Sequence, residues 1–257
     1  MELQAASRGR GPRVVLVHGF TQTHESWDPV TADLATDHEV VVVDAPGHGG
    51  SAGVRADLWA GADLLADVGG LATYVGYSMG ARLVLHLALG RPEVVERLVL
   101  LGGTAGIDSA EERAARRLAD ERLAEAVERD GTEPFIERWL AQPIFGGLTP
   151  SPTDLAARRA NAPSGLASSL RLAGTGTMDP PLWDRLHEVA APVLVVAGER
   201  DEKFRALGER LVDGLAGADR LHVVDGAGHA AHLEQPAAFA ALVRRFVATN
   251  RGAGPVS

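Results

Sequence analysis

Six short runs of β-branched and aliphatic residues recur along this chain, and stretches of helical length separate them. The runs occupy residues 13–18, 39–44, 72–77, 97–101, 192–197 and 220–224. Apolar runs without interruption are typical of strands that are covered on both faces of a parallel sheet. Their alternation with helices predicts right-handed strand–helix–strand crossovers. The chain is therefore expected to form an α/β fold with an open, mostly parallel, twisted sheet flanked by helices.

The spacing of apolar residues predicts these flanking helices over residues 26–36, 55–68, 79–90, 203–216 and 236–248. A different pattern interrupts the alternation, with helical stretches around residues 109–130, 133–141, 151–161 and 164–173 and no strand pattern among them. A helical block of this kind is interpreted as a cap that covers the carboxyl ends of the strands, where open α/β sheets bind ligands. We predict a core of residues 1–103 and 181–257 and an inserted helical cap of residues 104–180.

Charge and composition exclude several classes of function. The 257 residues carry a formal net charge of −9, which disfavours binding to nucleic acid or to an anionic membrane surface. No apolar run has the roughly 20 residues that a transmembrane helix needs, and the N-terminus lacks a signal-peptide pattern. The absence of cysteine excludes disulfides, thiolate catalysis and cysteine-ligated metals. We expect a cytoplasmic protein, either a monomer or a small homo-oligomer.

A candidate nucleophile lies in the sequence Gly76-Tyr77-Ser78-Met79-Gly80, between a predicted strand and a predicted helix. In such a G-x-S-x-G turn the serine side chain projects above the sheet, at the N-terminus of a helix that favours negative charge. The flanking glycines are needed because the strand and the helix nearly touch. The bare pattern also fits a turn that serves packing alone.

Two later strands end next to residues that would complete a catalytic triad. Asp201 follows the strand at 192–197, and His229 follows the strand at 220–224. A serine nucleophile needs a base, and the base needs an acid that orients it. Taken singly, Asp201 could be a helix N-cap and His229 a loop histidine. All three at strand ends, in the order Ser78, Asp201, His229, indicate a triad instead.

Backbone amides near Ser78 could form an oxyanion hole. In His18-Gly19-Phe20, directly after the first strand, the glycine would let the Phe20 N–H turn toward the site, and the Met79 N–H would be the second donor. The alternative is that His18-Gly19 only forms a turn. The comparable loop at residues 44–49 is interpreted as scaffold.

The motifs together resemble the α/β-hydrolase superfamily, and within it 2-succinyl-6-hydroxy-2,4-cyclohexadiene-1-carboxylate synthase of menaquinone biosynthesis. The resemblance spans nearly the whole chain. Its more particular segments are Ser78-Met79-Gly80-Ala81-Arg82, Trp139 with Gln142-Pro143 and Phe145, and Asp201-Glu202-Lys203-Phe204. Where the family often has a second glycine after the elbow, this chain has Ala81.

The resemblance implies an α/β-hydrolase fold and a lyase reaction. The family eliminates pyruvate from 2-succinyl-5-enolpyruvyl-6-hydroxy-3-cyclohexene-1-carboxylate. Ser78, activated by His229 and Asp201, would remove a proton next to the succinyl ketone, and the oxyanion hole would stabilise the charge on the ketone oxygen. The reaction requires no cofactor and no metal, and the partner is a small-molecule carboxylate substrate.

Arginine placement gives independent support for an anionic substrate. Arg82 lies in the first turn of the helix that follows Ser78, where a cation opposes the helix dipole at a cost of about 0.3–1 kcal/mol. A surface ion pair could offset this cost, as could a carboxylated ligand above the elbow. The resemblance assigns the second role to Arg82 and points to Arg116 and Arg159 in the cap, while Tyr77 and Trp139 could wall the pocket or serve as core.

Two other classes of function remain open at this stage. The same triad could hydrolyse carboxylic esters or carbon–carbon bonds, and the density of arginines around the pocket would discriminate between the lyase and a hydrolase. A non-catalytic ligand-binding protein is the third possibility, against which an intact serine–histidine–aspartate set argues. The pair His229 and His232 has the spacing of two metal ligands, but the chain has no cysteine and we expect no metal there.

Overall fold

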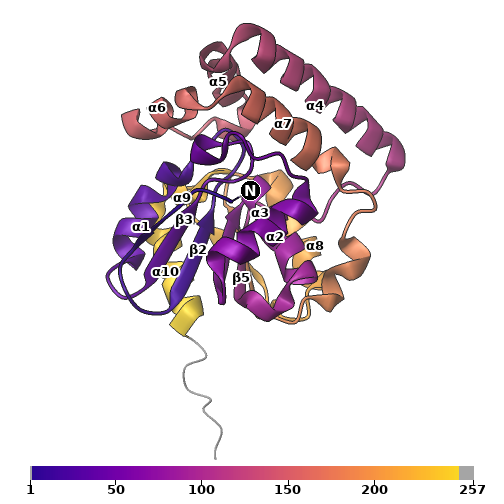
Figure 1. Ribbon diagram of the computed structural model, residues 1–257. Helices are drawn as coiled ribbons and strands as arrows, with labels where there is room; N and C mark the ends of the chain where they lie inside the picture. The colour runs from indigo at the N-terminus through magenta and orange to yellow at the C-terminus, as the bar shows by residue number, and fades with distance from the viewer. Residues whose placement is uncertain (1, 249–257) are drawn as a thin grey trace, which may run out of the picture.

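A seven-stranded sheet forms the centre of the computed structural model, which describes residues 2–248 (Figure 1). The strands run in the order β1-β3-β2-β4-β5-β6-β7 across the sheet. Their bounds are β1 Ala5–Arg8, β2 Arg13–Val17, β3 Glu39–Val43, β4 Ala72–Tyr77, β5 Val95–Leu101, β6 Val193–Gly198 and β7 Leu221–Val224. All neighbouring strands pair in parallel except β1, which runs antiparallel to β3. The predicted α/β fold is confirmed.

The strand β1 was not expected from the sequence. Its four residues, Ala5–Arg8, are mostly exposed and include no β-branched residue. As an edge strand it pairs on one side only, with Val40 to Val43 of β3. Such a strand needs no apolar run, so the pattern that identifies the six central strands is missing here.

Helices cover both faces of the sheet. On one face lie α1 (Asp28–Leu34) and α10 (Pro236–Ala248), and on the other α2 (Leu58–Gly69), α3 (Met79–Gly90) and α8 (Glu202–Gly214). Alternate residues of one strand divide between the two layers: Val14 and Leu16 pack with α1 and α10, and Val15 and Val17 with α2 and α3. Both faces of the strands are therefore buried, as their continuous apolar sequences indicated.

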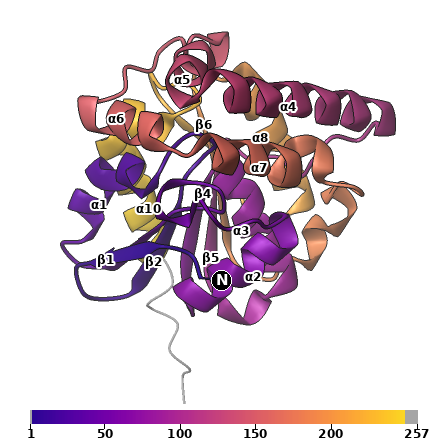
Figure 2. The same cartoon turned by 45° about the horizontal axis from the view of Figure 1, so that its top comes forward.

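Four helices between β5 and β6 form the cap. They are α4 (Ala110–Asp130), α5 (Thr132–Leu140), α6 (Pro152–Ala160) and α7 (Pro163–Ala173). They lie together over one end of the sheet, with a small apolar core of their own that includes Val127, Phe135 and Leu166 (Figures 1 and 2). The boundaries at residues 104 and 180 stay a prediction. Within residues 2–248, no helix combines the length and hydropathy that crossing a membrane requires.

Two glycines allow β4, α3 and β2 to approach each other closely at the elbow. A Cβ atom on Gly76 would lie 2.4 Å from the carbonyl oxygen of Gly80. A Cβ atom on Gly80 would lie 2.2 Å from the carbonyl oxygen of Val17 and 2.7 Å from that of His18. Because these neighbours are backbone atoms, no side-chain rotation can make room, and only glycine fits.

We expect Gly80→Ala to destabilise the protein by about 3 kcal/mol or more, since overpacking against fixed backbone exceeds what a core usually accommodates. The free energy of unfolding from denaturant titration measures this. Gly53→Ala is the matched control, because a Cβ atom there would meet nothing within 4 Å. Equal, small effects of both substitutions would contradict the close approach.

Candidate active site

Ser78 connects β4 to α3 in a strained backbone conformation. Its φ of 53° and ψ of −104° lie outside the regions that non-glycine residues usually occupy. Its N–H donates to the carbonyl oxygen of Leu101 at 2.9 Å, and its own carbonyl accepts from the Arg82 N–H. These bonds hold a conformation that costs about 1–3 kcal/mol in isolation, and strain of this kind gathers at functional sites.

The structure brings Ser78, His229 and Asp201 into one hydrogen-bonded chain. The Nε2 atom of His229 lies 3.2 Å from Ser78 Oγ, and its Nδ1 atom lies 2.6 Å from Asp201 Oδ2. Asp201 and His229 are buried, and Ser78 is partly accessible. In this geometry Asp201 fixes the imidazole so that Nε2 can accept the serine proton.

Asp201 has both of the roles that its sequence position allowed. Its Oδ1 atom accepts from the Phe204 N–H at 3.3 Å as the N-cap of α8, and its Oδ2 atom faces His229. The His229 ring is also held by aromatic neighbours, with ring centroids 4.4 Å away for Phe204 and 5.1 Å away for Tyr77. Packing and hydrogen bonding therefore fix the imidazole together.

The Phe20 and Met79 amides lie at the cavity beside Ser78, and neither donates a hydrogen bond within residues 2–248. Gly19 is required at the turn between β2 and Phe20, because a Cβ atom there would lie 2.7 Å from the Tyr77 ring. The Gly19 N–H is occupied by the Gln22 side chain at 3.0 Å. Two free N–H groups beside a serine are the arrangement an oxyanion hole needs.

A cavity of about 500 Å³ separates the triad from the cap. Core residues on its wall include Phe20, Ser78 and His229, and cap residues include Arg116 and Trp139. The Trp139 ring packs edge-on against Phe20, with centroids 5.0 Å apart. The cavity size suits a small organic ligand, and its walls combine aromatic surface with a few charged groups.

Arg82 is a buried cation on this wall. Its Nη2 atom donates to the carbonyl oxygen of Ala173 at 2.9 Å, while its Nε atom is buried without a partner in the described chain. No carboxylate of the described residues lies within ion-pair distance of it. Burial and, secondarily, the nearby Arg116 lower the pKa of Arg82 to about 10, so it remains charged at neutral pH. The surface ion pair considered for Arg82 is therefore excluded.

Arg116 reaches the same cavity from α4. Its Nε atom donates to both carboxylate oxygens of Asp120, at 2.9 and 3.0 Å, and its side chain is about one third exposed. Burial raises the pKa of Asp120 even though Arg116 is adjacent. Arg116 is thus partly neutralised, whereas Arg82 makes no ion pair among the described residues and is attracted by Asp120 only at longer range.

Two of the predicted binding residues do not reach the cavity. Arg159 lies on the outer side of α6, where it pairs with Glu133 and Glu137 at 3.3 Å each. Tyr77 is buried behind the site, against Gly19, His229 and His232, and does not line the cavity. The prediction for Arg159 is wrong because two neighbouring arginines on one helix point in different directions. Tyr77 is a core residue that supports the imidazole.

Sequence reasoning assigned no role to several residues that do line the cavity. They are Gln142, Phe145, Ser169, Lys203 and Phe204. Lys203 carried a usable signal, since it is the only lysine in the sequence and follows the triad aspartate by two residues. Ser169 carried none, because it lies in an ordinary amphipathic stretch of α7.

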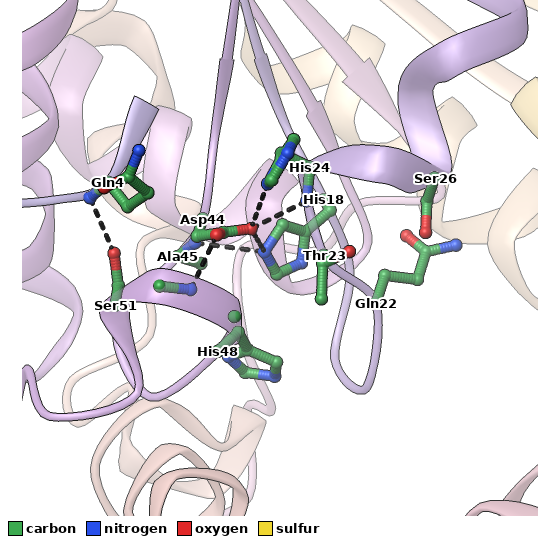
Figure 3. A network of polar contacts seen from close by, with 12 residues as sticks. Gln4, His18, Gln22, Thr23, His24, Ser26, Asp44, Ala45, His48 and Ser51 are labelled. Carbon is green, nitrogen blue, oxygen red and sulfur yellow. Dashed lines mark hydrogen bonds and ion pairs between the residues drawn. The ribbon is translucent and has the colours of Figure 1, made fainter. Parts of the chain in front are cut away.

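A network of buried polar groups lies beside residues 18–21, the loop that carries the Phe20 amide and that we call the oxyanion loop (Figure 3). Asp44 accepts from the His24 N–H at 2.8 Å, from its ring at 3.0 Å and from the Gly50 N–H at 2.8 Å. The His18 ring accepts from the Ala45 N–H, and the His48 ring accepts from the Thr21 N–H. The loop at residues 44–49 is therefore scaffold, as expected, but it holds the residues beside Phe20 in place.

Protonation of this network should destabilise the fold in acid. Burial lowers the pKa of His18 to about 4 and that of His48 to about 3, so the unfolded chain takes up these protons from about pH 6.5 downward and the folded chain does not. The stability that these two buried, neutral histidines contribute is fully present above pH 6.5. The free energy of unfolding should fall by roughly 1 kcal/mol per pH unit for each histidine as pH decreases toward 4.

Denaturant titrations at pH 7.5, 6.5, 5.5 and 4.5 would measure this slope. His48→Gln removes one titrating group and should reduce the slope relative to wild type. Stability that stays constant or rises between pH 6.5 and 4.5 would contradict the expected uptake of protons on unfolding.

Replacement of the triad acid should leave the fold but remove turnover. In Asp201→Asn the amide can still cap α8, but His229 is presented in the wrong tautomer, which costs about 10⁴ in kcat in the serine-protease case. We expect a loss of this order in steady-state turnover with a far-ultraviolet circular dichroism spectrum like that of wild type. Ser78→Ala should lose at least as much, and a fully active Asp201→Asn protein would refute the role of Asp201.

Comparison with known proteins places this geometry in a family. Residues 14–242 match the alpha/beta hydrolase family. A 2-succinyl-6-hydroxy-2,4-cyclohexadiene-1-carboxylate synthase from Klebsiella pneumoniae (strain 342) is 33% identical over 249 residues, covering 93% of this chain and 94% of the relative. The protein of the same name from Salmonella typhimurium is 34% identical over 235 residues, covering 88% and 90%.

Solved structures agree with this assignment. MenH from S. aureus superposes with a TM-score of 0.87 at 26% identity and covers 96% of this chain and 97% of its own. A thermophilic esterase from Thermogutta terrifontis, with malate bound, has a TM-score of 0.79 at 25% identity and covers 95% and 92%. The chain therefore belongs to the alpha/beta hydrolase family, in which its relatives include 2-succinyl-6-hydroxy-2,4-cyclohexadiene-1-carboxylate synthases.

Proposed function

We propose that this protein is a lyase that eliminates pyruvate from 2-succinyl-5-enolpyruvyl-6-hydroxy-3-cyclohexene-1-carboxylate, giving 2-succinyl-6-hydroxy-2,4-cyclohexadiene-1-carboxylate for menaquinone biosynthesis. The named relatives and the S. aureus MenH structure support this reaction. The substrate carries several carboxylates, so the site must supply cations as well as a base.

The observation that carries the proposal is the buried, unpaired guanidinium of Arg82, one helical turn after Ser78. A buried charge without a partner is strongly unfavourable, and Arg82 has one hydrogen bond to a carbonyl and a longer-range attraction to Asp120 to offset it. A substrate carboxylate in the cavity would supply the missing counter-charge. Arg116 of the cap and Lys203 of the core line the same cavity and are available for further carboxylates.

The triad supplies the base for the first step. His229 takes the Ser78 hydroxyl proton, and Ser78 Oγ takes the proton from the carbon next to the succinyl ketone. The electron pair left by that C–H bond moves into the ketone, and the developing oxyanion accepts hydrogen bonds from the Phe20 and Met79 amides. Preformed donors stabilise this charge because they do not have to reorient during the reaction.

The second step expels the leaving group. The electron pair returns from the oxyanion, a carbon–carbon double bond forms in the ring, and the bond between the ring carbon and the enolpyruvyl oxygen breaks. The leaving oxygen takes a proton from His229, and the enol form of pyruvate becomes pyruvate. No metal or cofactor takes part in this proposed route.

Ester hydrolysis is the second candidate. The Thermogutta terrifontis esterase shares the fold, and a serine–histidine–aspartate set with two free amides can form an acyl-enzyme as readily as it can remove a proton. Incubation with the enolpyruvyl substrate, with pyruvate release as the readout, separates the two. Pyruvate release together with negligible turnover of p-nitrophenyl acetate supports the lyase, and the reverse result supports the esterase.

Arg82 should matter for a charged substrate and not for a neutral one. A charge-assisted hydrogen bond in a dry pocket contributes about 1.5–3 kcal/mol, so Arg82→Ala should lower kcat/KM for the enolpyruvyl substrate by roughly ten- to two-hundred-fold. Arg82→Lys should restore only part of this, because an ammonium group cannot form the bidentate contact of a guanidinium.

A neutral p-nitrophenyl ester, if it is turned over at all, is the control substrate for this series. We expect kcat/KM for the ester to change by less than about threefold in Arg82→Ala, because a neutral ester has no carboxylate for Arg82 to bind. Equal losses with both substrates would show that Arg82 only supports the elbow, and would remove the main reason for an anionic substrate.

A further inference from the structure

Thr21, directly after Phe20, has a left-handed backbone conformation with a φ of 70°. A β-branched residue is unfavourable there, by about 1–3 kcal/mol. Thr21 is completely buried, and all three of its polar groups are hydrogen-bonded. Its N–H donates to His48 Nε2 at 3.2 Å, its hydroxyl accepts from Arg158 at 2.9 Å, and its carbonyl accepts from Asn161 at 2.9 Å.

Two of these three partners belong to the cap, although Thr21 belongs to the core. Arg158 lies on α6 and Asn161 directly follows that helix. The sequence separations from Thr21 are 137 and 140 residues. The conformation of Thr21, the residue after Phe20, is therefore fixed by a part of the chain that is distant in sequence.

The Arg158 side chain is itself held in a buried ion pair. Its Nε atom donates to Asp154 at 2.7 Å, one helical turn earlier, and both side chains are under 5% exposed. Asp154 also accepts from the Ser26 hydroxyl, in the 3₁₀ turn after the oxyanion loop. The guanidinium thus reaches Thr21 in one fixed direction, and Ser26 and Asp154 make a second link between the cap and the core.

Asn161 connects the same loop to the histidine-containing scaffold. Its Nδ2 donates to the Thr21 carbonyl and its Oδ1 accepts from the Gly49 N–H at 2.8 Å. The Asn161 carbonyl accepts from the Thr132 hydroxyl of α5 at 2.7 Å. One buried side chain therefore joins the cap, the oxyanion loop and the loop at residues 44–49.

We propose that Arg158 and Asn161 are positioning residues of the oxyanion hole: by holding Thr21 in its left-handed conformation, they direct the Phe20 N–H toward the oxygen on which charge develops. The inference rests on the oxyanion role proposed for Phe20. In this proposal the end of α6 helps to stabilise the transition state by positioning the oxyanion hole. Helices α4, α5 and α7 contact the ligand.

Direct binding of substrate by Arg158 is the competing explanation. Arg158 is 2% exposed and is absent from the cavity wall, whereas Arg82 and Arg116 line it. Two of its nitrogens donate to Asp154 and Thr21, and the third, Nη2, is buried without a partner among the described residues. Arg158 therefore acts on the reaction through Thr21 and not through contact with the ligand.

Thr21→Val and Thr21→Ser form a matched pair for the test. Valine keeps the β-branched shape and removes only the acceptor for Arg158, while serine keeps the acceptor. Complete removal of one oxyanion donor costs about 10²–10³ in kcat, so partial misdirection by Thr21→Val should lower kcat by roughly tenfold. KM should stay within about twofold, because the lost interaction strengthens only in the transition state. Thr21→Ser should retain a kcat near that of wild type.

Arg158→Lys tests the other end of the contact. A lysine can keep the ion pair with Asp154 but cannot donate to Asp154 and Thr21 together, so kcat should again fall with little change in KM. Arg159→Lys is the matched control, one residue away on the same helix in an exposed ion pair with Glu133 and Glu137. It should change kcat by less than about twofold.

A second readout does not depend on the identity of the substrate. A fluorophosphonate forms a bond from Ser78 Oγ to phosphorus and releases fluoride, and its phosphoryl oxygen occupies the oxyanion hole during attack. The rate of labelling should fall in Thr21→Val and Arg158→Lys and be unchanged in Arg159→Lys. If wild type is labelled but releases no pyruvate, the proposed lyase function fails while this inference can still be tested.

Thermal unfolding separates positioning from simple stabilisation. If Thr21→Val or Arg158→Lys unfolds at a lower temperature than wild type, it is assayed 20 °C below its own midpoint of unfolding. A variant that then retains the kcat and the labelling rate of wild type would overturn the inference. So would a loss in Arg158→Lys that appears in KM alone, since that result indicates ligand contact. Equal labelling rates for Thr21→Val and Thr21→Ser would have the same consequence.

Discussion

The close approach of three backbone segments at Gly76 and Gly80 determines where Ser78 and the loop after β2 lie. Gly80 brings the first turn of α3 against the carbonyl oxygens at the end of β2, and Gly76 lets the same helix start directly above β4. As a result Ser78 projects beyond the sheet, and the loop after β2 passes beside it. Phe20 and Met79 line the same cavity, although they are far apart in sequence.

Among the arginines that line the cavity, Arg82 is the one without an ion pair to a described carboxylate. Most arginines of the cap are neutralised by nearby carboxylates, as Arg159 is by Glu133 and Glu137 and Arg171 is by Glu121 and Glu128. Arg82 differs because it is buried and contacts only a backbone carbonyl. Since an uncompensated buried charge is costly, its position favours a ligand that brings negative charge into the cavity.

The cap contributes to the site at two different places. Helices α4, α5 and α7 supply the cavity wall, with Arg116, Trp139 and Ser169 among their residues. The end of α6 does not line the cavity; there Arg158 and Asn161 donate hydrogen bonds to Thr21. On the proposed function, variation in the first group would change which ligand fits, whereas the second group would act on the backbone next to the oxyanion hole. One inserted segment would then affect both ligand selection and the geometry of the reaction.

The sequence by itself determined the six central strands, the helices between them and the triad, because those features depend on local periodicity and on which residues follow strand ends. Gly76, Gly80, Ser78, Asp201 and His229 could all be identified in this way. The edge strand β1 could not, since a strand that pairs on one side has no apolar signature. Only the tertiary structure decided the directions of side chains on the cap helices. Arg158 is buried and Arg159 is partly exposed, although they are adjacent in sequence and similar in chemistry. The difference arises because successive helical residues are rotated by about 100°, and the packing of α6 on the oxyanion loop fixes which one faces inward.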